Sequence, residues 1–240
     1  MTVQFDAATG RLRLPRDEFD ALATLVRGGD VDNARLAELR SAGAVRGRQP
    51  HPVLVPVLGA VAEPVCGLRL ELVDDQRRTE QGEGWVAGDA AALLLESPEA
   101  GQCELVAVHP MFLPAAIARI VRLGPRPRIP AAEPLQVRPE LLDRLTSHHS
   151  GVREDAAREL PPGASAAALA SGLRLDWSVR ASWTGLRDSL GGRTLRVLDT
   201  VAGLWLVEPG GGAMVVWPTT PTAVWRALVL LLPRDVELSR

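Results

Sequence analysis

Four strand-like segments follow one another closely in the first half of the chain, and they constrain the fold more than any other feature. Residues 65–74 alternate leucines with charged side chains, which is typical of a half-buried strand. Further strand-like segments follow at 85–87, 92–95 and 104–108. Because parallel neighbours need long crossovers, strands this close in sequence must pair antiparallel. The sequence therefore predicts an antiparallel sheet.

The C-terminal third has the same texture. Residues 173–182 alternate apolar and polar side chains, and strand-like segments follow at 193–198, 204–207 and 214–217. Each of the two strand-rich stretches ends in a proline-initiated helix, and the two helices share residues at a constant spacing of 107. The shared residues are Pro114 and Pro221, Ala116 and Ala223, and Arg119 and Arg226. Two interpretations stay open: a duplicated α+β unit, or the common strand–proline–helix arrangement.

Helical segments flank the strands. The N-terminus predicts a hairpin over 3–14, followed by helices from Pro15 to Gly28, over 33–41 and over 51–62. Residues 75–84 are polar and predict a mobile loop. A proline-rich connection over 124–134 leads to further helices at 139–147, 152–160 and 164–171. We expect an α+β fold with a central antiparallel sheet and two pseudo-symmetric halves. Within one compact domain, the expected divisions are 1–124, 125–172 and 173–240.

The charged residues exclude several function classes. All 27 basic residues are arginine, and a chain without lysine forms neither a Schiff base nor a Walker phosphate loop. The formal net charge of −2 gives no overall attraction to nucleic acid.

Catalytic motifs are missing from the sequence. It contains no His-Glu-x-x-His, no Gly-x-Ser-x-Gly and no Gly-x-Gly-x-x-Gly following a strand. His148 and His149 have no third metal ligand at suitable spacing. We therefore predict no catalytic residue, metal or cofactor. The alternative is a small-molecule enzyme with Asp199, His109 or Asp74 in a cleft.

The cysteines and the apolar segments indicate the compartment. Cys66 and Cys103 lie 37 residues apart and are expected to be buried free thiols. The N-terminus lacks the charged start and apolar run of a signal peptide. The most apolar stretch, 223–232, is too short to span a bilayer and contains Arg226. We expect a cytoplasmic protein that does not insert into membranes.

Three tryptophans are candidate partner contacts. Trp177 and Trp183 differ by six residues, so both point to one face of a regular strand. Together with Trp85 they could form an exposed apolar platform that binds a partner, or they could pack in the core. The platform would also allow a third function, a self-associating structural module.

The C-terminal third carries a family resemblance. The segments that carry it are Leu198-Asp199-Thr200, Ala202-Gly203, the strand 204–207, Val215-Val216-Trp217-Pro218 and the closing helix 224–232. Together they resemble the corresponding part of EspG-family proteins. The N-terminal part is also similar to that family in layout, with Leu12-Arg13-Leu14-Pro15 entering a helix that contains Phe19 and Leu22, and Gly43-Ala44-Val45 before a helix that ends near Pro64.

The resemblance implies a non-enzymatic function. EspG-family proteins are cytosolic chaperones of actinobacterial type VII (ESX) secretion. They bind the apolar tip of helical secretion substrates, such as PE–PPE pairs, and keep them soluble. The loop 75–84 lies where the family has a variable loop. We therefore expect PE–PPE-like partners, with Arg77 and Arg78 as candidate contacts beside the three tryptophans.

Overall fold

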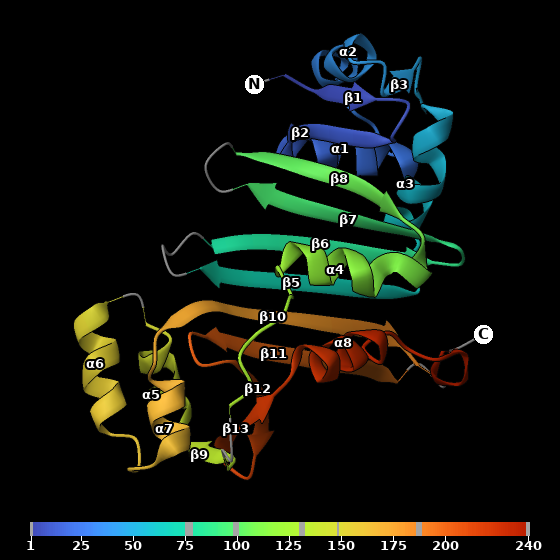
Figure 1. Cartoon of the computed structure of the whole chain (residues 1–240). Helices are drawn as coiled ribbons and strands as arrows, with labels where there is room; N and C mark the ends of the chain where they lie inside the picture. The colour runs from blue at the N-terminus through green and yellow to red at the C-terminus, as the bar shows by residue number, and fades with distance from the viewer. Residues whose placement is uncertain are drawn as a thin grey trace.

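A computed structural model describes residues 2–74, 79–97, 101–129, 133–147, 149–185 and 189–238. Within these residues, eleven strands form one fully antiparallel sheet in the order β1-β2-β8-β7-β6-β5-β10-β11-β12-β13-β9 (Figure 1). The sheet strands are β1 (Gln4–Asp6), β2 (Arg11–Pro15), β5 (Cys66–Asp74), β6 (Thr79–Ala87), β7 (Ala90–Ser97), β8 (Gln102–Val108), β9 (Leu135–Val137), β10 (Leu173–Thr184), β11 (Leu190–Thr200), β12 (Leu204–Gly210) and β13 (Ala213–Thr219). The predicted α+β fold with a central antiparallel sheet is confirmed.

Helices cover the sheet on both sides. The α-helices are α1 (Arg16–Val26), α2 (Asn33–Ser41), α3 (Val55–Ala62), α4 (Leu113–Ile120), α5 (Pro139–Leu145), α6 (Ser150–Arg158), α7 (Ala164–Leu169) and α8 (Pro221–Val229). The remaining short elements are β3 (Val45–Arg46), β4 (Gln49–Pro50), η1 (Pro52–Leu54), η2 (Pro110–Phe112) and η4 (Asp235–Glu237). None of the helices in the described part of the chain is long and apolar enough to cross a membrane.

The strand order is symmetric about the central pair β5 and β10. On one side of this pair lie β6, β7, β8 and β2, with β1 as an additional edge strand, and on the other lie β11, β12, β13 and β9. In each half, three helices connect the outer strand to the central one, and a single helix, α4 or α8, follows the last strand. Ile117 of α4 and Val121, which caps the C-terminus of α4, are buried, as are their counterparts 107 residues later, Val224 and Leu228 of α8. The topology therefore supports the internal repeat that the helix residues indicate.

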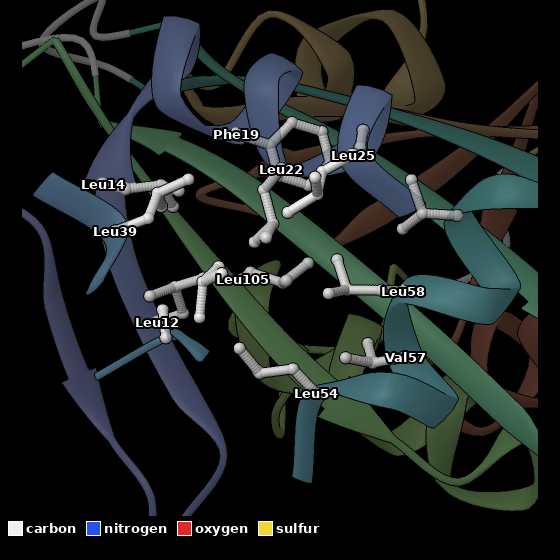
Figure 2. Packing of buried hydrophobic residues seen from close by; sticks show 14 of the residues in the cluster. Leu12, Leu14, Phe19, Leu22, Leu25, Leu39, Leu54, Val57, Leu58 and Leu105 are labelled. Carbon is white, nitrogen blue, oxygen red and sulfur yellow. The ribbon is translucent and has the colours of Figure 1, made fainter. Parts of the chain in front are cut away.

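The helices divide the sheet into two unlike faces. Helices α1 to α3 pack over one half, where their leucines meet those of β2 and β8 (Figure 2). Helices α5 to α7 pack over the other half, against Leu198 of β11 and Trp205 of β12. Direct partners across strands share a face, and the register from Ala92 in β7 to Leu198 in β11 puts both groups on the same face. We call it the bundle face. The opposite face is covered by α4 and α8, which contact each other, and we call it the α4–α8 face.

Two local predictions differ from the structure. Residues 79–84 belong to strand β6, so the predicted loop 75–84 is wrong over that part. The glycines of β6 interrupt the alternation of apolar and polar residues by which a strand is predicted. A Cβ on Gly84 would lie within 3.1 Å of Leu68 and Leu93, which fill the space above this glycine. Residues 75–78 lie outside the described residues. The three-residue strand β9 was not predicted, and it lies in the segment 125–172 together with α5 to α7. The division of the chain at 124 and 172 stays a prediction.

Both cysteines are buried free thiols, as predicted. Burial raises the pKa of Cys66 to about 11 and that of Cys103 to about 11. Because the thiolate is the reactive form, both should resist a thiol reagent at pH 8. We expect no labelling by iodoacetamide in buffer and two labelled cysteines in denaturant, measured by intact mass. Rapid labelling of the native protein would contradict this.

Candidate functional site

The middle of the bundle face is an open polar strip. Several side chains on β5, β10 and β11 that point to this face are exposed, because α1 to α3 and α5 to α7 cover only the two ends. The opposite set on the same strands forms the core under α4 and α8. The exposed members of the strip are Arg69, Glu71, Arg180, Ser182 and Thr194. Because successive side chains along each strand alternate between the two faces, one face of these strands is buried and the other is open to solvent.

Ion pairs hold the two ends of the strip. Arg196 of β11 donates to both carboxylate oxygens of Asp176 on β10, at 3.2 and 2.8 Å. Burial lowers the pKa of Arg196, but the hydrogen bonds and charge of Asp176, together with the charges of Asp143 and Glu71, outweigh burial and leave the pKa raised. At the other end, Arg16 of α1 donates to Glu83 of β6 at 3.1 Å and to Glu96 of β7 at 2.7 Å. These charges are satisfied within the chain.

A small cavity adjoins the strip where α5, α6 and α7 meet the sheet. Its volume is about 230 Å³. Buried Leu145, Leu169 and Leu198 line it, and the more exposed Ser150 and Glu154 belong to the same lining. An apolar cavity with polar groups at its opening accommodates an apolar side chain of a partner.

The predicted tryptophan platform is not exposed. Trp177 and Trp183 are 2% and 8% exposed and belong to the core under α4 and α8. The guanidinium of Arg193 also lies 5.1 Å from the Trp183 ring centre. Trp85 points to the opposite, bundle face, where it stacks on Phe19 of α1 with ring centres 5.6 Å apart. The exposed platform is therefore wrong for the free chain, whereas self-association stays a prediction. Partner contact by these three residues stays a prediction.

Arg77 and Arg78, the other predicted contacts, lie outside the described residues. The sequence interpretation also did not single out the aromatic residues that are exposed on the α4–α8 side. Phe112 of η2 is 63% exposed, Trp217 of β13 is 42% exposed and Trp225 of α8 is 39% exposed. Only the tertiary packing distinguishes these from the buried tryptophans.

Asp199 has a structural role. Arg126, in the crossover between the two halves, donates to both Asp199 oxygens, and its Nη2 lies 2.6 Å from Oδ2. The Thr200 hydroxyl donates to the Gly203 carbonyl at 2.9 Å. A Cβ on Gly203 would lie 2.8 Å from the Pro127 carbonyl oxygen, so the crossover runs directly over this turn. The motif that resembles EspG proteins in sequence therefore fastens the crossover to the sheet.

Of the other residues of the enzyme alternative, Asp74 has the same register partner as Asp199, Leu175 of β10, whereas His109 caps a turn. Nδ1 of the exposed His109 accepts the Met111 backbone N–H at 3.2 Å, which caps η2. Asp74 lies at the end of β5. Within the described ranges, no group of three His, Cys, Asp or Glu side chains could hold a metal ion.

Comparisons with known proteins support the fold. No protein-family model matches the sequence, and no curated protein matches it. A solved structure does match: the type VII secretion system chaperone EspG5 of Mycobacterium tuberculosis, determined in complex with a PE25-PPE41 dimer. The TM-score is 0.66 at 15% sequence identity, over 95% of this chain and 100% of that chain. The likeness shows that this chain has the fold of that chaperone, which confirms the EspG-like resemblance at the level of fold.

Proposed function

We propose that this protein is a non-enzymatic cytosolic chaperone that binds helical substrates of a type VII (ESX) secretion system, such as PE–PPE-like pairs, and keeps them soluble. The observation that carries the proposal is the structural likeness to EspG5 over 95% of this chain and 100% of that chain. The structure adds a rigid sheet whose bundle face stays open between two helical groups. The function needs no cofactor or metal.

The bundle face suits such a partner. The strip over β5, β10 and β11 offers hydrogen-bonding and charged side chains, and the cavity under α5 to α7 offers a place for an apolar side chain. A helical tip laid across both would lose its exposed apolar surface to the interface. Stable complexes bury about 800 Å² on each partner, so we expect the partner to contact the flanking helices as well as the strip. The partner then stays soluble because its apolar tip no longer contacts water or other copies.

Co-expression tests the proposal. The chain is produced together with each helical secretion substrate encoded beside it, and complexes are detected by size-exclusion chromatography. We expect one substrate pair to remain soluble only in the presence of this chain and to elute with it. If no neighbouring pair binds, the proposed function is wrong.

A matched pair of variants then locates the surface. Ser182 lies on the strip and Ala115 on helix α4, and both are exposed. Ser182→Trp should block docking on the bundle face, whereas Ala115→Trp should leave the complex intact. Equal binding by both variants would place the partner elsewhere.

A further inference from the structure

Two arginines face each other at the centre of the open strip. Arg69 of β5 and Arg180 of β10 are direct partners in the antiparallel register, and both side chains are exposed. Directly opposite residues have Cβ atoms about 4.5–5.5 Å apart, and like charges at such positions destabilise a sheet. Within the described residues neither guanidinium makes a hydrogen bond or ion pair. The centre of the sheet therefore carries two unneutralised positive charges.

Two of the three neighbouring carboxylates, those of Glu83 and Asp176, are already engaged. Glu83 lies directly opposite Arg69 on β6, but it accepts a hydrogen bond from Arg16 at 3.1 Å. Asp176, on the same strand as Arg180, is bound by Arg196 at both oxygens. Glu71 is exposed beside the pair, and its charge acts on Arg196. The chain keeps a costly like-charge pair while it neutralises the arginines on either side.

We propose that Arg69 and Arg180 together form a receptor for one carboxylate, supplied by an Asp or Glu side chain on the helical tip of the partner. The inference rests on the proposed function and names the chemistry that the partner must present. A guanidinium binds a carboxylate through two parallel N–H···O bonds, so two opposed guanidiniums can enclose one carboxylate from both sides. A bound carboxylate would attract both guanidiniums and so offset the repulsion between the two arginines.

The surroundings favour a single carboxylate over a polyanion. Glu71, Asp176 and Glu83 lie around the pair on the same face. A nucleic acid or an anionic membrane would bring many negative charges against these carboxylates, whereas a single carboxylate brings one charge beside Glu71 and is attracted by both arginines. The two arginines thus attract a carboxylate, while the surrounding carboxylates disfavour a ligand that carries many negative charges.

A charge-reversal experiment on the complex tests the inference. R69E/R180E replaces both arginines with glutamates, which would repel the carboxylate of the partner. We expect about a hundredfold weaker partner binding in calorimetry. R119E/R226E is the matched control, because it makes the same change in net charge at two exposed arginines on α4 and α8. It should change the affinity less than about threefold. If the complex forms and both double variants bind alike, the receptor is overturned while the proposed function stands.

A second experiment needs no partner. The free protein is titrated with N-acetylglutamate α-amide, and the side-chain Nε–Hε signals of the arginines are followed by NMR. We expect saturable shifts at Arg69 and Arg180, weaker shifts at Arg119 and Arg226, and none with the glutamine analogue. Equal shifts at all four arginines overturn the receptor. If no substrate pair binds in co-expression, the proposed function has failed, and this titration still decides whether the carboxylate receptor exists.

Discussion

Replacing Asp199 by alanine is expected to lower the free energy of unfolding by about 3–5 kcal/mol. The Asp199 side chain is 5% exposed and holds Arg126 through both of its oxygens. Removing the carboxylate leaves a guanidinium without a counter-charge on the crossover between the two halves, which runs over the turn at Gly203. Urea unfolding followed by tryptophan fluorescence measures the loss.

A double replacement separates the lost pair from the charge that is left behind. Arg126→Met combined with Asp199→Leu removes both charges, and we expect it to be less destabilising than Asp199→Ala alone, because buried ion pairs often stabilise no more than apolar residues of similar size. Arg48 and Asp30 form an exposed pair at 2.9 Å, and Asp30→Ala should cost less than about 1 kcal/mol. A cost for Asp199→Ala as small as that of Asp30→Ala would show that the crossover is not fastened at Asp199.

Trp177→Ala is expected to cost about 3–5 kcal/mol in unfolding free energy. Trp177 is 2% exposed and lies on β10 between Leu72 of β5 and Val197 of β11, beneath the helices of the α4–α8 face. Truncation would leave a cavity in the centre of the sheet, where few neighbours can collapse into it. The same urea titration measures the effect.

Trp225 provides the control for this substitution. It is 39% exposed on α8, so Trp225→Ala should cost less than about 1 kcal/mol. Trp177→Phe should recover most of the stability that Trp177→Ala loses, because it refills most of the cavity. A small cost for Trp177→Ala, together with a loss of partner binding, would instead favour the original interpretation of this residue as a partner contact.

The sequence predicts the strands and helices because their patterns are local. The alternation over 65–74 and 173–182 corresponds to strands with one side under α4 and α8. The prediction of strands from alternation fails at residues 79–84. Gly82 and Gly84 stand where the pattern would have apolar side chains, and leucines on neighbouring strands fill that space. The prediction also misses β9, because three residues are too few to show a period.

The candidate site depends on contacts that no local pattern contains. Arg69 and Arg180 are 111 residues apart in sequence, and only the register between β5 and β10 makes them opposite partners. The side of the sheet to which a tryptophan points likewise depends on register. Trp85 and Trp177 therefore lie on opposite faces of the sheet, although each occurs in a strand of similar sequence pattern.

Site-directed photo-crosslinking tests the central claim, that the partner docks on the bundle face, most directly. The buried Cys66 and Cys103 leave introduced cysteines as the reactive thiols. Glu71→Cys and Thr194→Cys place a benzophenone label on the strip, and Ala115→Cys places it on α4. In the co-expressed complex, the first two labels should crosslink to the helical partner upon irradiation, and the third should not. Crosslinking from Ala115→Cys alone would contradict the account.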